Sequence, residues 1–468
     1  MVNHPLPQVV LTREMNRFVF LLVILVLVSG GFSQPLRISS DHRYFTQNGR
    51  PFFWLGDTGW LLFVKCTREE TIKYLDKRRQ QGFNVVQVMV LHDLKKARNI
   101  YGDDAVKDRD VSKPVVTPGS DPRDAEQYDF WDHIDWVVGE AAKRGMYAAL
   151  VPVWGSNVKD GSVNEKQAAA YAKFLAERYK NKPNIIWLNG GDLRGDQGTD
   201  VWKTIGSTLR KYDKNHLITF HPRGRTSSSE WFHDEAWLDF NMFQSGHRNY
   251  EQDNSTGEHH FGEDNWRYTA IDYALKPVKP VLDGEPSYEN IPQGLHDPKM
   301  PRWNDADVRR YAYWSVFAGG AGFTYGENSM IQFYEKGDKD PAYGAEIDWR
   351  ESINSPGANQ MRFLKKLMLS KPYFERVPAN EIVADQGERY QYVAATRGRN
   401  YAFLYSYVGR AIKVKMDFLP GKTVKFKWFD PRTGAYLKGG SVANTGTATF
   451  DPPGEEKAGN DWVLVLEG

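Results

Sequence analysis

Two carboxylates follow short apolar runs, in patterns that could do chemistry. Asp192 closes the stretch WLNGGD, and Glu285 stands in the stretch DGEP between a glycine and a proline. A single Asp at the start of a loop is more often a helix cap or a turn residue than a catalyst. A pair facing one cleft is different, because cleavage of a glycosidic bond requires one protonated and one ionised carboxyl group. The elements that position the two side chains therefore decide between these interpretations.

Short apolar runs alternate with helical patterns from residue 51 to about 325, which is typical of a parallel sheet. In the first helical pattern, Thr67 is a good N-cap with Glu70 three residues on, and Gly82 is a stop. Eight strands are expected, at 51–57, 84–93, 146–155, within 184–196, and at 217–224, 237–247, 279–289 and 321–328. This count predicts an α/β fold, a (β/α)8 TIM barrel, at residues 34–375. A doubly wound open sheet is the alternative, but LGDTGW lacks the glycine spacing of its phosphate loop.

After Tyr373 the pattern changes to alternating runs separated by Gly, Pro and Asn turns. This pattern predicts a C-terminal antiparallel β-sandwich at residues 376–468. We expect the sandwich to be a structural brace packed on the barrel, and a carbohydrate-binding role is the alternative.

The active site of such a barrel lies where the strands end, because all carboxyl ends meet at one rim. The polar and aromatic residues at these ends, besides Asp192 and Glu285, are Asp57, His92, Asp93, Trp154, Asn189, His221, Gln244, His247, Tyr325 and Glu327. Since Asp192 follows the fourth strand and Glu285 the seventh, we expect them to face each other across the barrel mouth.

A substrate-binding set is expected around this pair. Trp60, Trp154 and Tyr325 could stack on sugar rings. His92, His221 and His247 could hydrogen-bond sugar hydroxyls. The polar residues Asp57, Asn189 and Gln244 complete the predicted set.

Several other classes of site lack their motifs. The sequence contains no H-x-H, H-E-x-x-H or C-x-x-C motif, so no metal is expected. Neither a G-x-S-x-G elbow nor a P-loop is found, and no cofactor is expected. The formal net charge of +2 disfavours a nucleic-acid or membrane partner. The oligomeric state is left open.

The N-terminus predicts export. Residues 1–33 hold a basic patch and then the run FVFLLVILVLVSGG, which is the length of a signal-peptide core, with cleavage expected after Ser33. A membrane anchor is the alternative. Because Cys66 is the only cysteine, the chain is not expected to be a lipoprotein. We expect a periplasmic or extracellular protein.

Three motifs in barrel order, FFWLGDTGW, WLNGGD and DGEP, resemble those of the glycoside hydrolase family 140 apiosidases. The resemblance covers nearly the whole chain after the signal, including the C-terminal module. It implies a retaining endo-apiosidase of a Bacteroidetes-type glycan system, which cuts the bond between apiose and the galacturonan backbone of the pectin rhamnogalacturonan II. It also implies that Asp192 is the acid/base and Glu285 the nucleophile of a double displacement.

The sequence departs from the wider clan at the fourth strand. There the clan usually has Asn-Glu, whereas Gly190 and Gly191 separate Asn189 from Asp192. A neighbouring carboxylate is therefore an alternative acid. A retaining glycosidase for another plant polysaccharide and a non-catalytic glycan-binding protein of the cell surface are the alternative functions.

Overall fold

The computed structural model describes residues 1, 34–254 and 256–468. The expected signal peptide, apart from Met1, lies outside these residues. Among the helices of the described ranges, none is both long enough and apolar enough to cross a bilayer.

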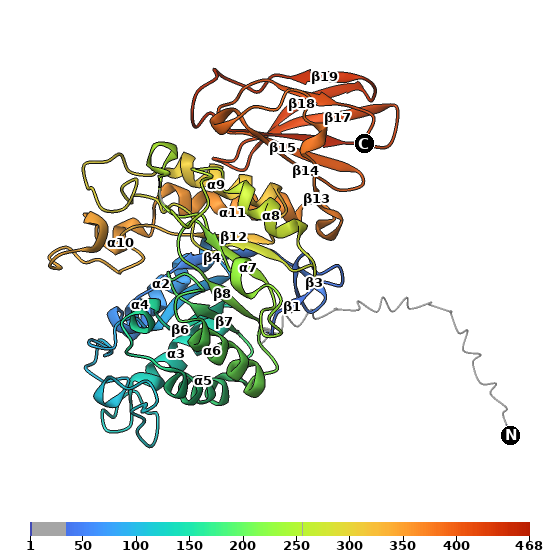
Figure 1. The fold of residues 1–468 in the computed structure, drawn as a ribbon. Helices are drawn as coiled ribbons and strands as arrows, with labels where there is room; N and C mark the ends of the chain where they lie inside the picture. Colours follow the sequence, from blue (N-terminus) through green and yellow to red (C-terminus); the bar gives the residue numbers. More distant parts are fainter. Residues whose placement is uncertain (2–33, 255) are drawn as a thin grey trace. The chain divides into compact units, whose positions relative to one another are not determined.

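A nine-stranded sheet forms the barrel (Figure 1). Its strands are β4 (Trp54–Thr58), β5 (Val85–Leu91), β6 (Tyr147–Val153), β7 (Ile185–Gly190), β8 (Ile218–His221), β9 (Thr226–Ser227), β10 (Asn241–Gln244), β11 (Val281–Asp283) and β12 (Gly322–Tyr325). They are ordered β8-β7-β6-β5-β4-β12-β11-β10-β9, and all neighbours pair in parallel except β9 and β10. At the seam, Asp239 N donates to Ile218 O at 2.8 Å, which nearly closes the ring. The predicted (β/α)8 barrel is confirmed.

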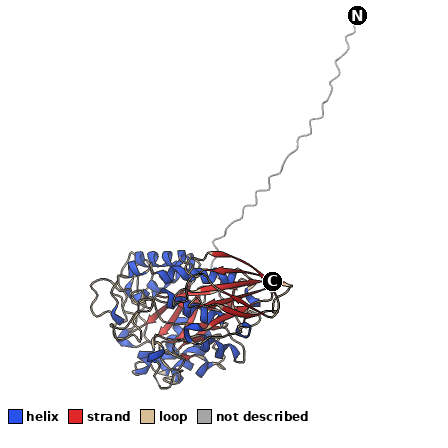
Figure 2. Ribbon diagram, turned by 90° about the horizontal axis from the view of Figure 1, so that it is seen from above, coloured by secondary structure: helices blue, strands red, loops and turns tan. Residues whose placement is uncertain are grey.

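Helices surround the barrel strands (Figure 2). They are α1 (Leu62–Lys65), α2 (Arg68–Gln80), α3 (Phe130–Lys143), α4 (Gly155–Lys159), α5 (Glu165–Tyr179), α6 (Thr199–Tyr212), α7 (Ser229–Phe232), α8 (Trp266–Ala274), α9 (Asp305–Phe317), α10 (Trp349–Ser352) and α11 (Pro356–Leu369). Because helices cover the outside and side chains fill the inside, every residue of β5, β6 and β7 is buried. The predicted start of α2 is confirmed, since Thr67 and Glu70 form a reciprocal capping box.

The expected strand at 51–57 is divided in two. A short antiparallel meander, β1 (Arg37–Ile38), β2 (Phe45–Gln47) and β3 (Arg50–Phe52), precedes β4. Phe53 separates β3, which pairs with β2, from β4, which pairs with β5 and β12. A continuous apolar run therefore serves two sheets.

The C-terminal residues form two antiparallel sheets. One has the order β13-β14-β15-β20-β17-β18 and the other consists of β16 and β19, so the predicted sandwich is confirmed. The strands are β13 (Val377–Pro378), β14 (Val393–Arg397), β15 (Tyr401–Ser406), β16 (Ile412–Lys415), β17 (Thr423–Phe429), β18 (Tyr436–Ala443), β19 (Thr447–Phe450) and β20 (Trp462–Glu467).

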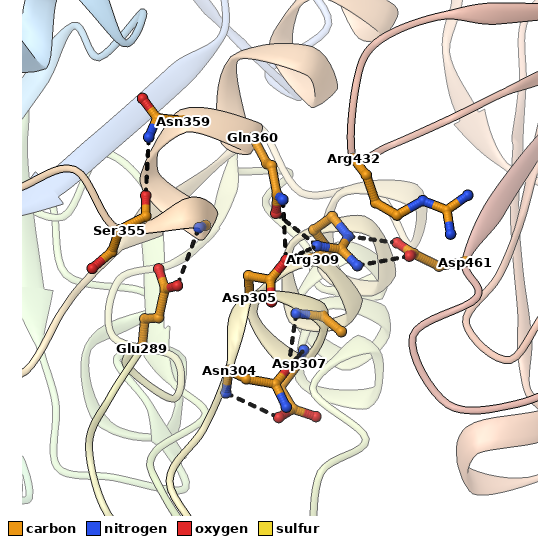
Figure 3. Close-up of polar contacts among 12 residues, drawn as sticks. Glu289, Asn304, Asp305, Asp307, Arg309, Ser355, Asn359, Gln360, Arg432 and Asp461 are labelled. Carbon is orange, nitrogen blue, oxygen red and sulfur yellow. Dashed lines mark hydrogen bonds and ion pairs between the residues drawn. The ribbon is translucent and has the colours of Figure 1, made fainter.

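A buried ion pair joins the sandwich to α9 (Figure 3). The Arg309 guanidinium donates through Nε and Nη2 to the Asp461 carboxylate, at 2.8 Å each. Both side chains are almost fully buried. The next arginine, Arg310, lies 4.9 Å from the ring centre of Tyr407, which belongs to the sandwich. These contacts pack the sandwich against α9 of the barrel.

Candidate active site

A cavity of about 470 Å³ opens where the barrel strands end, and Asp192 and Glu285 both line it. Small-molecule sites are commonly about 300–1,000 Å³ in volume, so the cavity can take a sugar and part of its neighbour. Five of the predicted substrate-binding residues also line it: Trp60, His92, Trp154, Gln244 and His247.

The loop that carries Asp192 is held in an unusual backbone conformation. Gly190, Gly191 and Asp192 all have positive φ, at 94°, 125° and 50°. Gly191 N donates to His221 O and Gly191 O accepts from Gly155 N, at 2.9 Å each. A Cβ at Gly191 would lie 2.7 Å from Cε3 of Trp154. The two glycines therefore let the turn pass close to an indole and present Asp192 to the cavity.

The environment of Asp192 favours its protonated form. Its side chain is exposed to the water of the cavity, but the cavity walls enclose it. This enclosure, followed by the negative charge of Glu285, raises the pKa of Asp192 from 3.8 to about 6. Interactions with His221, Arg223 and His247 act in the opposite direction on this pKa and are outweighed.

The environment of Glu285 favours its ionised form. Burial alone would raise its pKa, but contacts with His221 and His247 outweigh burial and lower the pKa to about 2. His247 Nε2 lies 3.1 Å from Glu285 Oε1, and His221 Nε2 lies 3.2 Å from Glu285 Oε2. Each carboxylate oxygen thus has its own imidazole.

The two carboxylates come from strands that are not directly opposite each other in the barrel. Asp192 follows β7 and Glu285 follows β11, as predicted. In the sheet order, β8, β10 and the short β9 paired with β10 separate these strands on one side, and β6, β5, β4 and β12 separate them on the other. The expectation of opposite positions on the rim is therefore only approximate. What the pair offers is a proton donor and an anionic nucleophile in one cavity, which is the pairing that glycosidic bond cleavage requires.

Aromatic rings form one wall beside Glu285. Trp60 lies 5.6 Å from Trp154, measured between ring centres, and 5.3 Å from His221. The Trp60 indole N–H donates to the Tyr288 hydroxyl at 3.2 Å, and Tyr288 packs edge-on against His247. Such a wall fixes the imidazoles and offers ring faces to a sugar.

Four predicted substrate-binding residues do not line the cavity. Asp57 is fully buried and accepts from Arg78 Nε at 2.7 Å. The Asn189 amide donates to Trp202 O at 2.7 Å. The Tyr325 hydroxyl donates to Glu289, and His221 lies behind Glu285. Asp57 and Tyr325 are register partners on β4 and β12, so their side chains share one face of the sheet, which is turned away from the cavity. Direct contact with substrate is therefore not expected of these four.

Other lining residues were not predicted from the sequence. They include Tyr288, Tyr343, Lys159 and the three arginines Arg223, Arg225 and Arg248. Tyr288 stands three residues after Glu285, and the arginines follow β8 and β10. Extending the search a few residues beyond each strand end would therefore have identified them as candidates. Within the described residues, no group of three or more His, Cys, Asp and Glu side chains could hold a metal ion.

The chain was compared with known proteins. A family model described as "Apiosidase-like, catalytic domain" matches residues 39–375, and one described as "Putative collagen-binding domain of a collagenase" matches residues 377–467. None of the curated proteins compared matches the chain.

Solved structures agree with this assignment. One described as a glycoside hydrolase is 45% identical with a TM-score of 0.87, covering 93% of this chain and 97% of its own. A glycoside hydrolase family 5 protein from Bacteroides vulgatus is also 45% identical, with a TM-score of 0.86 and coverages of 92% and 93%. A family 5 mannosidase from Rhizomucor miehei shares the fold, at 12% identity and a TM-score of 0.52, over 73% of this chain and 99% of its own. The chain belongs to the apiosidase-like family and is a glycoside hydrolase.

Proposed function

We propose that the chain is a retaining endo-apiosidase that cleaves the bond between apiose and the galacturonan backbone of rhamnogalacturonan II. One observation carries the mechanism: a single cavity holds a carboxyl group whose pKa is raised to about 6 and another whose pKa is lowered to about 2. Between these values the pair carries one proton, and Asp192 holds it.

The reaction then has two displacements. Glu285 attacks the anomeric carbon of apiose while Asp192 gives its proton to the departing glycosidic oxygen, which leaves as a hydroxyl of the galacturonan. A covalent glycosyl–enzyme ester results. Asp192, now ionised, takes a proton from water as that water attacks the same carbon, and Glu285 is released as a carboxylate. The product keeps the configuration of the substrate.

The choice of sugar rests on the family and on the three motifs that resemble family 140 apiosidases. The cavity volume is compatible with this choice, since it exceeds what one pentose needs. We also propose that the enzyme acts outside the cytoplasm, as the apolar segment before residue 34 indicates.

Digestion of rhamnogalacturonan II tests the proposal. The enzyme should release oligosaccharides with apiose at their reducing end, identified by mass spectrometry, and proton NMR of the first product should show retained anomeric configuration. Glu285→Gln should release none, although its shape is nearly unchanged.

Two outcomes would contradict the proposal. Release from a mannan or galactan but not from rhamnogalacturonan II would assign another substrate. An inverted first product would exclude the double displacement.

A further inference from the structure

The active-site cavity carries an excess of positive charge. Its lining includes Lys159, Arg223, Arg225 and Arg248. Among the described lining residues, the carboxylates are Asp192 and Glu285, and Asp192 is the one whose pKa is raised. The whole chain has a net charge of only +2, so this local excess is not a general property of its surface. A neutral glycan would gain little from such a lining.

Three of these cations form a cluster, the arginine rim, which consists of Arg223, Arg225 and Arg248. All three also line a second hollow that adjoins the cavity. The rim follows β8 and β10, on the shorter path round the barrel between the strands that carry Asp192 and Glu285. Arg223 lines the same cavity as Asp192, and its charge acts to lower the pKa of that carboxyl group.

The protein itself neutralises the arginine rim only partly. Glu258 Oε1 lies 3.4 Å from Arg223 Nε, and Glu258 Oε2 lies 3.5 Å from Arg225 Nη2, so one carboxylate serves two arginines at long distances. Arg248 Nη1 instead donates to uncharged oxygens, the Gln252 carbonyl at 3.3 Å and the Asn254 side chain at 3.0 Å.

Arg225 is a buried guanidinium that the protein pairs incompletely. Only 5% of the residue is exposed, and within the described residues its Nη1 has no hydrogen-bond partner. Burial, followed by the charge of Arg248, lowers the pKa of its guanidinium. A buried cation with an unused donor is stabilised when an anion binds beside it.

We propose that the arginine rim is a carboxylate-binding subsite, which holds an acidic sugar on the leaving-group side of the scissile bond. This inference rests on the proposed function and deepens it. We place the subsite on the leaving-group side because Arg223 acts on Asp192, the acid of the proposed mechanism. That acid protonates the glycosidic oxygen and therefore lies beside the group that departs. A uronate carboxylate can accept paired N–H donors from a guanidinium, a geometry that a neutral hydroxymethyl group cannot use.

A matched pair of substrates tests the subsite. One is an apiosyl oligosaccharide with galacturonate on the leaving side, and the other is the same compound with each carboxylate reduced to an alcohol. We expect wild-type kcat/KM to be roughly tenfold or more higher for the acidic compound, since charged hydrogen bonds are the strong ones. The ratio of the two kcat/KM values should fall toward one in Arg223→Ala and Arg248→Ala. Arg123→Ala, an exposed arginine in a remote loop, should keep the wild-type ratio.

A binding measurement separates this inference from the proposed function. Glu285→Gln, which cannot turn over, is titrated by calorimetry with oligogalacturonate and with carboxyl-reduced oligogalacturonate. Preferred binding of the acidic form, weakened by salt and by Arg248→Ala, supports the subsite even if no apiosyl bond is cut. Equal affinity for both forms, or equal wild-type kcat/KM for both substrates, would overturn the subsite while leaving the apiosidase proposal intact.

Discussion

Removal of the Asp192 carboxyl group should abolish the fall of kcat/KM above about pH 6. Its pKa is raised from 3.8 to about 6, so at pH 5 the group is about 90% protonated, compared with about 6% had the pKa stayed at 3.8. Wild-type kcat/KM should therefore fall about tenfold per pH unit above pH 6, as the acid loses its proton. Glu285 stays ionised down to about pH 2, so no loss is expected on the acidic side in the usual range.

Asp192→Asn keeps the size of the side chain but removes the carboxyl proton that the mechanism donates. For the natural substrate we expect kcat/KM to fall about 10²–10⁴-fold, the usual contribution of a general acid. For an aryl apioside whose leaving group needs no proton, the first displacement should survive, and the glycosyl–enzyme ester on Glu285 should accumulate. The limb near pH 6 should vanish with that substrate.

The control lies in the same loop. Asp196 is exposed and pairs with Arg194 at 2.7 Å, so Asp196→Asn should keep the wild-type profile. Stopped-flow release of the aryl group and mass spectrometry of the intact protein measure the two steps. Persistence of the limb near pH 6 in Asp192→Asn would show that another group supplies the proton, and the assignment of the acid would then be wrong.

Three further changes probe the surrounding structure. His247→Ala removes one of the contacts that hold the pKa of Glu285 low; the acidic limb of kcat/KM should therefore move to higher pH, which assays below pH 5 would reveal. Gly191→Ala places a Cβ 2.7 Å from an indole carbon at a φ of 125°, so we expect about 1–3 kcal/mol lower stability by urea unfolding, together with lower kcat/KM. Asp461→Asn leaves the buried Arg309 guanidinium with Asp305 as its remaining carboxylate partner and should cost about 1–3 kcal/mol, measured by the same unfolding assay, with kcat/KM at low temperature little changed.

The barrel was predictable because its signals are local and repeated. β6 is a continuous apolar run, as expected when both faces of a parallel strand are buried, and Thr67 with Glu70 marks the start of α2 by a capping box. The chain positions of Asp192 and Glu285 follow from the same pattern, because parallel strands end at one rim. The split of residues 51–57 was not predictable, because an apolar run does not show which sheet each half joins.

The lining of the cavity was less predictable, because it depends on which way each side chain points. Asp57, at the end of β4, turns outward to Arg78, whereas Trp60 lies beyond the end of the same strand and faces the cavity. The arginine rim comes from loops, whose course depends on contacts with distant residues such as Glu258. Residue type and position at a strand end therefore singled out the two candidate carboxylates, Asp192 and Glu285, but not the arginines that line the same cavity.

The arginine rim affects the pKa of Asp192, and a bound acidic substrate should change that effect. In the free enzyme the positive charge of Arg223 lowers the pKa of Asp192, against the larger effects of enclosure and of Glu285. A uronate bound to the rim would neutralise that cation and add negative charge near the carboxyl group, so the pKa of Asp192 should rise further in the complex. The basic limb of kcat, which reports the complex, should then lie at higher pH than that of kcat/KM, which reports the free enzyme. The carboxyl-reduced substrate lacks the anion and should bring the two limbs together, so an acidic substrate would help to keep the proton that its own cleavage requires.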